Sequence, residues 1–309
     1  MPYEKPEEPG DDFMKIKKKV NREIIYSMLG VLPALVVFFT FTYFPLLMTL
    51  RYSFTDWDGF GKNYKFIGMQ NFVTMFKEPD IMQSFLNTIY IAVFSIIIGT
   101  VLQLALALVL YDKFKGKSFV RAIFYMTCII SPVIVSMTWV GFFQYTGVIN
   151  EFLKSIHMNF LVFDWLGDIR SVKPVLIFIN AWQWVGYGMV IYLTGLNSIP
   201  VDVYESGMLD GATGFKKFRF ITLPLLMPAV TVNAFVSITG ALRMFDLPFV
   251  LTSGGPMNAS KTISMSIYEN AFAYERFGYA SSIGLVFFIF IAIVTISQLK
   301  ITRKLEVEY

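Results

Sequence analysis

Several polar and aromatic side chains that could bind a small molecule stand inside otherwise apolar stretches of the chain. They are Asn180, Gln183, Trp184, Tyr187, Arg243 and Asp246. Amide and charged groups supply directional hydrogen bonds, and Trp and Tyr rings supply flat apolar surfaces with a polar tip. This combination is typical of a site for a sugar. The alternative is that Asn180 and Gln183 only hydrogen-bond to neighbouring helices.

Charges inside apolar stretches are costly and need a partner or a cavity. Arg243 lies about one helical turn before Asp246, so an internal ion pair would explain both residues. Arg243 could instead meet an anionic sugar, such as a uronate or a phosphate ester. Gln103 and Asn233 are further polar residues within apolar stretches.

The residues that catalysis or metal binding would need are scarce. The chain has one histidine, His157, and one cysteine, Cys128, and it contains neither GxSxG nor HExxH. Gly116-Lys117-Ser118 is similar to the end of a phosphate-binding loop, but Tyr111 stands where the first glycine of that motif would be. We therefore expect no enzyme activity, no metal site and no nucleotide bound through a Walker motif.

Six apolar stretches are long enough to span a membrane as helices, and they contain most of these residues. A spanning helix needs about 20 apolar residues, and only 16% of this chain is charged, against roughly 25% in an average soluble domain. We expect an all-α integral membrane protein, because a soluble helical protein would lack polar surface to cover such a core. The stretches cover about 24–50, 84–111, 119–146, 174–197, 221–246 and 279–300.

Lys and Arg are distributed unevenly between the loops. They gather ahead of the first stretch and at 113–121, 216–219 and 300–304, and such loops face the cytoplasm. Both termini are therefore predicted to be cytoplasmic, with a Pro- and acid-rich tail at 1–23 and a membrane domain at 24–309. The net charge of +4 then reflects membrane topology rather than nucleic-acid binding. Aromatic residues in the opposite loops, at about 51–83, 147–173 and 247–278, indicate either an interfacial belt or a docking surface.

The polar passage between the fourth and fifth stretches predicts an elbow at about 198–220. Pro200 can begin a short helix over 201–209, and Asp210-Gly211 can end it, because glycine accepts a positive φ. A second short segment would follow at Thr213–Phe220. The small residues at the centre of the first helix would let another protein approach closely, whereas the alternative is an amphipathic helix lying on the membrane.

This elbow resembles the EAA loop of ABC importer permeases, in which E-A-A is followed by D-G-A, F, I, L-P and a further P. The matching residues are Glu205-Ser206-Gly207, Asp210-Gly211-Ala212, Phe218, Ile221, Leu223-Pro224 and Pro228, with Ser and Gly in place of two alanines. Further segments are similar to permeases of the carbohydrate-uptake branch and extend the resemblance to nearly everything after residue 24. They are Gly68–Phe72, Asn87-Thr88, Gly147–Asn150, Asn180–Trp182, Phe245-Asp246, Leu251–Pro256 and Phe277–Ala280.

The resemblance implies the type I ABC importer permease fold in a bacterial plasma (inner) membrane. It makes the elbow a coupling helix that docks into a cytoplasmic ATPase. The coupling residues carried over are Glu205, Ser206, Gly207, Asp210, Gly211 and Ala212. The implied partners are two copies of an ATP-binding subunit, a second homologous permease subunit and an extracytoplasmic solute-binding protein. ATP and Mg would be bound by the ATPase, and this chain would hold no cofactor.

In the maltose-type permeases that the chain resembles, the substrate contacts lie in matching parts of the fourth and fifth spans. Carried over, they fall near Asn180, Gln183, Trp184 and Arg243. We therefore expect this chain to form half of the path for an oligosaccharide or related sugar. The alternatives are import of glycerol phosphate or an anionic uronate oligosaccharide by the same fold, and a membrane receptor or scaffold without transport.

Overall fold

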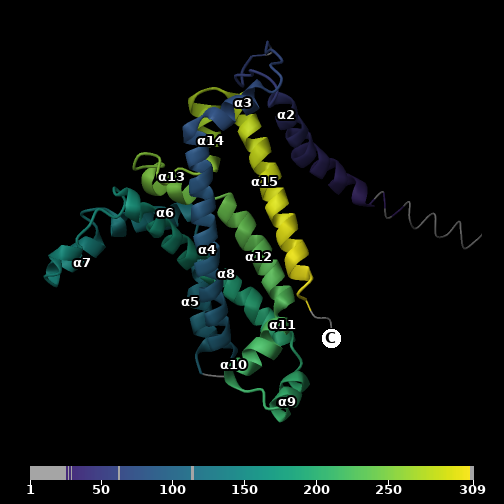
Figure 1. Ribbon diagram of the computed structural model, residues 1–309, viewed down its shortest axis with the longest axis vertical. Coiled ribbons are helices and arrows are strands. Elements are labelled where there is room, and N and C mark those ends of the chain that lie inside the picture. Colours follow the sequence, from purple (N-terminus) through teal and green to yellow (C-terminus); the bar gives the residue numbers. More distant parts are fainter. Residues whose placement is uncertain (1–25, 27, 29, 62, 113–114, 307–309) are drawn as a thin grey trace, which may run out of the picture. The chain divides into compact units, whose positions relative to one another are not determined.

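A computed structural model describes residues 26, 28, 30–61, 63–112 and 115–306 (Figure 1). The described chain is helical, and its one β-type pairing is a bridge between Thr55 and Phe66. Six of its helical segments are long and apolar enough to span a membrane, which confirms the predicted all-α architecture; the expected tail at 1–23 lies outside the described residues. These segments are Gly30–Tyr52, Pro79–Tyr111, Pro132–Ser155, Ile169–Ser198, Met227–Thr252 and Phe277–Arg303.

The segment up to Tyr52 is a unit of its own and contains η1 (Phe39–Tyr43) and α2 (Phe44–Tyr52). The wider π-turn of η1 lies just before Pro45, which has no N–H to continue an α-helical ladder. None of the residues in η1 and α2 is buried. A helix that is apolar and unburied on all sides needs lipid or another chain around it.

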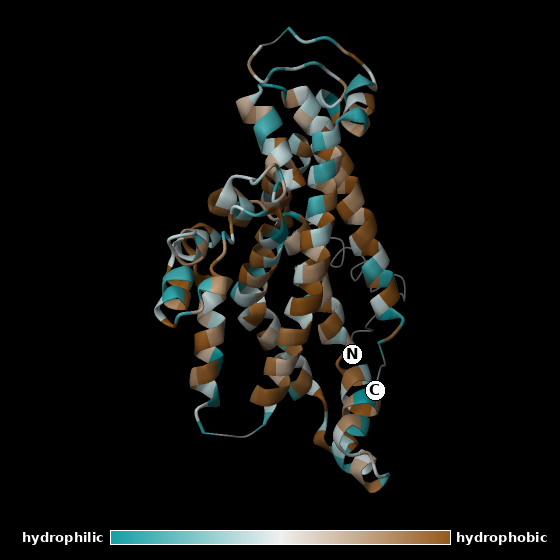
Figure 2. Cartoon of the chain, turned by 60° about the vertical axis from the view of Figure 1, so that its left-hand side comes forward, coloured by the Kyte–Doolittle hydropathy of each residue, from teal (hydrophilic) through white to brown (hydrophobic). Residues whose placement is uncertain are grey.

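Four long helices form the core of the second unit, which covers 53–309. They are α4 (Pro79–Tyr111), α8 (Ile169–Ser198), α12 (Met227–Leu242) and α15 (Phe277–Arg303). α8 packs against α4 and α12, and α12 also packs against α15. Apolar residues dominate these helices, and polar residues gather in the loops and short helices at their ends (Figure 2).

Small residues bring α8 close to its neighbours. A Cβ added at Gly188 would lie 2.2 Å from the Gln103 side chain of α4, and one added at Gly186 would lie 2.0 Å from the carbonyl oxygen of Phe124. Phe124 belongs to α5 (Lys117–Ile129). In membrane proteins, where water does not drive helices together, this close approach is a main source of association.

The prediction of a single helix over 119–146 is wrong, because the chain forms two helices there. α5 ends at Ile129, Ser131 is extended with ψ 134°, and α6 (Pro132–Phe143) begins at the proline. The residue before a proline is pushed out of the helical region, while proline itself fits the first turn of a new helix. The two pieces also have different neighbours, because α5 packs against α8 and α6 packs against α13 (Asp246–Thr252).

The prediction of one helix over 221–246 is also wrong, because the chain forms separate helical pieces there. α12 ends at Leu242, residues 243–245 are non-helical, and Asp246 begins α13. Ahead of α12 the chain forms η3 (Phe218–Thr222) and the short α11 (Leu223–Leu225). Prolines at 224 and 228 divide this entry into short pieces, because neither supplies an N–H to the helical ladder.

One end of the second unit is built from short helices and the loops between them. Here α3 (Gln70–Lys77), α14 (Ile263–Tyr268) and η4 (Glu269–Ala273) lie near the start of α4 (Figure 1). The Asn87 side chain of α4 donates to the carbonyl oxygens of Asn258 and Lys261 at 2.8 and 3.1 Å. These bonds hold the loop after α13 against α4.

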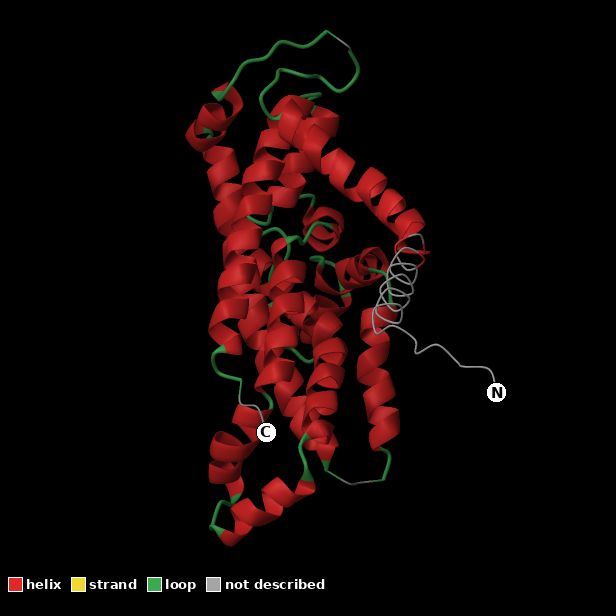
Figure 3. Cartoon of the chain, turned by 90° about the vertical axis from the view of Figure 1, so that its right-hand side faces the viewer, coloured by secondary structure: helices red, strands yellow, loops and turns green. Residues whose placement is uncertain are grey.

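The opposite end carries α9 (Val201–Leu209) and α10 (Gly214–Lys217) (Figure 3). The remaining short elements, α7 (Val148–Ser155) and η2 (Asn159–Leu161), follow α6. Asn150 anchors this segment, because its side chain donates to Tyr145 and Phe163 carbonyl oxygens and accepts from the Trp165 indole. The two ends of the unit are therefore built from different sets of short helices.

Candidate functional site

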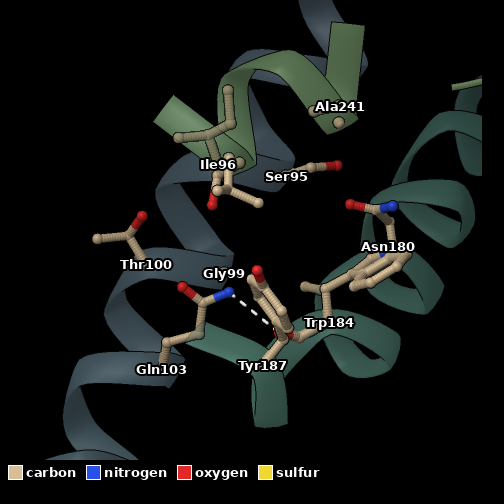
Figure 4. A pocket seen from close by; sticks show the side chains of 13 residues that line it. Ser95, Ile96, Gly99, Thr100, Gln103, Asn180, Trp184, Tyr187 and Ala241 are labelled. Carbon is tan, nitrogen blue, oxygen red and sulfur yellow. Dashed lines mark hydrogen bonds between the residues drawn. The ribbon is translucent and has the colours of Figure 1, made fainter. Parts of the chain in front are cut away.

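A cavity of about 140 Å³ lies halfway along α4, where α4, α8 and α12 come together (Figure 4). Its lining combines two aromatic rings, several small residues and a few uncharged polar groups. The lining residues are Ser95, Ile96, Gly99, Thr100, Gln103, Asn180, Ala181, Trp184, Tyr187, Val236, Ser237, Gly240 and Ala241. None of them carries a formal charge.

The α8 wall of the cavity provides aromatic surface. Asn180, Trp184 and Tyr187 recur at four- and three-residue spacing, which places them on one face of the helix. The Trp184 and Tyr187 rings meet edge-on at 6.3 Å, and their side chains remain 39% and 37% exposed. Open ring faces beside an amide can stack on an apolar surface and bond a hydroxyl at the same time.

Ser95 on the α4 wall carries an unused hydroxyl. The residue is 4% exposed, and its Oγ has no hydrogen-bond partner within the described chain. A buried hydroxyl without a partner is unfavourable by roughly 1–3 kcal/mol. In Figure 4 this hydroxyl and the Asn180 amide point toward one another above the two rings. Together they are suited to receive a polar group of a ligand.

The floor of the cavity is a buried hydrogen-bonded junction of the three helices. Gln103 Nε2 donates to the Trp184 carbonyl oxygen at 3.2 Å, and Asn233 Nδ2 donates to Gln103 Oε1 at 2.8 Å. Gln103 and Asn233 are 5% and 1% exposed. Hydrogen bonds between buried amides on different helices fix the relative rotation of those helices.

Gln183 does not line the cavity, and its side chain contacts the chain around the break between α5 and α6 instead. It is 2% exposed, and its Nε2 donates to the Ile130 carbonyl oxygen at 3.3 Å. Thr127 Oγ1 in turn donates to the Gln183 carbonyl oxygen at 3.0 Å. This side chain therefore satisfies the Ile130 carbonyl oxygen, at the point where the chain leaves α5.

Arg243 and Asp246 do not line the cavity, and the ion pair expected between them is not formed. Arg243 Nε donates to the Thr239 carbonyl oxygen at 3.0 Å, and both charged residues are exposed. The expectation assumed one continuous helix with the two residues a turn apart. The break at 243–245 removes that geometry and leaves Asp246 at the start of α13.

Sequence reasoning missed the α4 and α12 walls of the cavity. The residues missed are Ser95, Gly99, Thr100, Ser237 and Gly240. A signal exists for α4, because Ser95, Gly99 and Gln103 recur every four residues and are all buried. A stripe of small and polar residues along one face of an apolar helix marks a packed or polar surface rather than a lipid-facing one.

The elbow forms as the sequence predicts. α9 follows Pro200 and runs over Val201–Leu209, and Gly211 has φ +80°. The Gly211 and Ala212 N–H groups donate back to the Met208 and Gly207 carbonyl oxygens at 3.1 and 2.9 Å. These bonds close the helix end, as a left-handed glycine normally does.

The elbow has an inner and an outer face. Tyr204 is buried under the Lys217 ammonium, 4.3 Å from the ring centre, and its burial raises the pKa of the phenol. A Cβ at Gly207 would lie 2.2 Å from Ile221 Cδ1 of the same chain. The smallness of Gly207 therefore serves contact within the elbow. The outer face carries Glu205, Ser206 and Asp210, and at its tip Leu209 is 90% exposed.

An apolar core joins the elbow to the cavity helices. Tyr204 belongs to the same buried cluster as Leu110 at the end of α4 and Leu196 at the end of α8. Leu226, ahead of α12, belongs to it as well. The elbow thus shares one apolar cluster with the ends of α4 and α8 and with the residue ahead of α12.

The family model described as "Binding-protein-dependent transport system inner membrane component" matches residues 95–307. The chain belongs to this family. It is therefore an ABC transporter permease subunit with several membrane spans, a non-catalytic inner membrane component, as the elbow sequence indicates. The membrane receptor, the scaffold and the membrane enzyme are set aside.

Curated relatives from several bacteria match almost end to end. The chain is 31% identical over 295 residues to the probable starch degradation products transport system permease protein AmyD of Thermoanaerobacterium thermosulfurigenes, covering 96% of this chain and 100% of that one. It is 35% identical to the probable ABC transporter permease protein YurN of Bacillus subtilis, covering 91% and 97%. It is 32% identical to the multiple sugar-binding transport system permease protein MsmF of Streptococcus mutans, covering 95% and 100%.

A solved structure shares the fold. The crystal structure of a bacterial ABC transporter involved in the import of the acidic polysaccharide alginate matches with a TM-score of 0.79 and 26% identity, covering 94% of this chain and 99% of that one. A complex of the alginate transporter with a pentasaccharide-bound periplasmic protein matches with a TM-score of 0.77 and 27% identity, covering 92% and 94%. The type I importer fold is thereby established for nearly the whole chain.

Proposed function

We propose that this permease forms one half of the path by which an ATP-driven importer takes up a neutral oligosaccharide delivered by an extracytoplasmic binding protein. The observation that carries the proposal is the cavity itself. On α8 two open aromatic rings stand beside an amide, and across from them α4 carries a hydroxyl without a partner in the described chain; the lining bears no charge. A sugar presents apolar C–H faces to such rings and hydroxyls to such polar groups.

Neutrality of the lining favours an uncharged sugar. The nearest candidate cation from the sequence, Arg243, lies outside the cavity with its Nε bonded to Thr239. An anionic oligosaccharide remains the second candidate, because the alginate transporter shares the fold. In that case the exposed Arg243 would supply the positive charge at the approach to the cavity.

A second permease would complete the cavity. Ligand sites for small molecules are usually closed spaces of roughly 300–1,000 Å³, whereas this chain encloses about 140 Å³. Trp184 and Tyr187 also keep more than a third of their surface exposed. A homologous subunit facing these rings would close the site around an oligosaccharide.

The elbow would dock into a cytoplasmic ATP-binding subunit, present in two copies, which binds ATP and Mg. Its exposed tip offers Leu209 to an apolar groove and Glu205 to a cation, while the core around Tyr204 would pass movement to α4 and α8. Lys216, Lys217 and Arg219 would then lie at the cytoplasmic headgroups, with both termini on the same side.

Uptake of labelled oligosaccharides by the assembled complex tests the path. Trp184→Leu is expected to lower uptake at least tenfold while the complex still purifies intact, because it removes the larger ring of the wall. Phe288→Leu is the matched control, since Phe288 is a 51% exposed aromatic of α15 outside the cavity. Normal uptake by Trp184→Leu would overturn the site. Arg243→Gln separates the two substrate classes, because only uptake of a uronate oligomer should fall.

Co-purification tests the elbow. Glu205→Lys is expected to lose the ATP-binding subunit and to keep the second permease, whereas Glu151→Lys on α7 should keep both. Glu151 is a suitable control because it is an exposed acid of α7, outside the elbow, which pairs with Lys154 of the same helix. Retention of the ATPase by Glu205→Lys would contradict the coupling role.

A further inference from the structure

A row of aromatic side chains runs along one end of the second unit, from the break after α12 to the loop before α3. Its members come from α13, α14, η4, the start of α15 and the 53–61 loop, which are distant in sequence. They are Phe249, Phe245, Tyr268, Phe272, Phe277, Trp57 and Phe60. We call this set the aromatic row.

Each ring from Phe249 to Trp57 lies beside the next, and Phe60 at the end pairs with Phe277, with 6.2 Å between the ring centres. Along its middle, the centres of Phe245 and Tyr268 are 5.3 Å apart, those of Tyr268 and Phe272 are 5.2 Å apart, and those of Phe272 and Phe277 are 5.3 Å apart. Trp57 continues from Phe277 at 5.6 Å. The steps are regular and comparable with the length of one pyranose unit in an oligosaccharide chain.

The row is on the surface rather than in the core. Phe272 is 64% exposed, Phe60 is 77% exposed, and Tyr268 and Phe249 are 41% and 36% exposed. No member belongs to the buried hydrophobic clusters of the described chain. These four rings keep exposed surface within the described residues, whereas Phe245, Phe277 and Trp57 are half-buried.

Specific contacts hold the outer part of the row in place. The Gly278 N–H donates to the Trp57 carbonyl oxygen at 2.8 Å, and a Cβ at Gly278 would lie 2.1 Å from the Thr55 carbonyl oxygen. The Asn71 side chain donates to the Ser53 and Thr55 carbonyl oxygens at 2.9 and 2.8 Å. The 53–57 loop is thereby fixed against the start of α15, which sets Trp57 beside Phe277.

The row begins where the cavity wall ends. Gly240 and Ala241 line the cavity, and the chain then leaves α12 through Arg243 to reach Phe245, the inner ring of the row. At the other end, Trp57 also lines a shallow hollow of about 220 Å³ together with Asp56, Glu275 and Arg276. The row thus links the cavity approach to a polar hollow on the loops.

Exposed charges at both ends argue against a lipid as the occupant. Arg243 and Asp246 flank Phe245, and Glu275 and Arg276 lie next to the Trp57 end; all four residues are exposed. Charged side chains avoid the hydrocarbon of a bilayer. Rings bordered by hydrogen-bonding groups instead match a sugar, whose C–H faces are apolar and whose edges are hydroxyls.

We propose that the aromatic row is a second sugar-binding surface, which receives successive pyranose units outside the cavity and leads them into it. This inference rests on the proposed function, because it requires an oligosaccharide substrate. It adds a length dependence: a longer chain covers more rings of the row, whereas a disaccharide is held mainly by the cavity.

The test compares uptake of a disaccharide and a longer oligosaccharide by the full complex with its binding protein. The double variant Tyr268→Leu/Phe272→Leu removes two central rings but keeps apolar bulk. It is expected to lower uptake of the longer sugar about tenfold and that of the disaccharide less than threefold. Tyr268→Phe/Phe272→Tyr keeps both rings and should retain uptake of both sugars. Phe288→Leu, outside the row, controls for loss of any exposed ring.

Two results would overturn the inference. Equal losses of uptake for the two sugars would mean that the row does not distinguish oligosaccharides by length. Loss of the second permease on purification of the row variant would make the row a subunit interface. The Trp184→Leu variant separates this failure from a failure of the proposed function. If Trp184→Leu blocks uptake and the row variant does not, only the row is wrong; if neither affects uptake, the cavity assignment fails.

Discussion

Two adjacent faces of α8 carry similar polar side chains, but these side chains have different roles. Asn180 and Gln183 are one turn apart, yet Gln183 is buried and bonded to Ile130, whereas Asn180 lines a cavity with open rings beside it. One face is satisfied within the chain, and the other leaves polar and aromatic surface unused. A polar residue in a spanning helix therefore indicates a ligand site only when no partner within the chain satisfies it.

The largest expected effect is on the satisfied face. Gly186→Ala would put a Cβ 2.0 Å from the Phe124 backbone oxygen, and backbone cannot move aside as a flexible side chain can. Overpacking costs about 1–3 kcal/mol, and we expect the upper end of that range. A thermal unfolding assay of the purified complex should show a lower midpoint. Gly141→Ala in α6 is the control, because nothing lies within 4 Å of its added Cβ; equal midpoints for both variants would contradict the packing argument.

Gln183→Leu is expected to destabilise the chain without impairing sugar binding. The Ile130 carbonyl oxygen would lose its bond from Gln183 Nε2 at 3.3 Å, and an unsatisfied buried group costs about 1–3 kcal/mol. The unfolding midpoint should fall, while KM for uptake by the surviving complex stays constant. A raised KM would place Gln183 in the substrate path. Both faces of α8 would then contact the substrate, which would contradict the comparison.

On the open face, Tyr187→Leu should raise KM for uptake and leave the unfolding midpoint nearly unchanged. An aromatic pair contributes about 0.5–1.5 kcal/mol beyond its buried area, and stacking on a sugar of similar strength corresponds to a change of about 2- to 12-fold. Tyr187→Phe keeps the ring and should lie closer to the wild type. If the two variants behave alike, the hydroxyl rather than the ring contacts the substrate.

Ser95→Ala is the mildest change and the sharpest test of the open face. Its hydroxyl has no partner in the described chain, so removal should leave the midpoint equal or slightly higher. Loss of one hydrogen bond to a sugar, about 0.5–1.5 kcal/mol, should raise KM about 2- to 12-fold. Weaker binding together with unreduced stability identifies a ligand-facing group; a fall in stability with constant KM would make Ser95 a packing residue.

Hydropathy was sufficient to predict six spans and the helical class, because bilayer thickness sets the length of an apolar run. It missed the breaks at 130–132 and 243–245, because the first lies within an apolar run and the charged residues at the second, Arg243 and Asp246, were interpreted as an ion pair within one helix. Pro132 offered a signal for the first break, and the charged residues Arg243 and Asp246 offered one for the second. The end of α9 was predictable, because Gly211 takes a φ of +80° that few other residues accept.

The cavity was only half predictable. Asn180, Trp184 and Tyr187 stand out in an apolar helix, but Ser95, Gly99 and Ser237 look like ordinary packing residues. Whether a small polar residue is satisfied depends on the helix opposite, which a single sequence does not reveal. The same limit applies to Gly207, whose close neighbour proved to be Ile221 of the same elbow.

The interruption at Ser131 has a mechanical consequence. A helix carries an axial push only as far as its ladder of hydrogen bonds is continuous, and that ladder stops between α5 and α6. A displacement of α5 would therefore reach α8, through the tight contact at Gly186, rather than α6. α5 and α6 would then move as two separate short helices connected at Ser131. A movement of α5 would act on α8, the helix that carries Asn180, Trp184 and Tyr187.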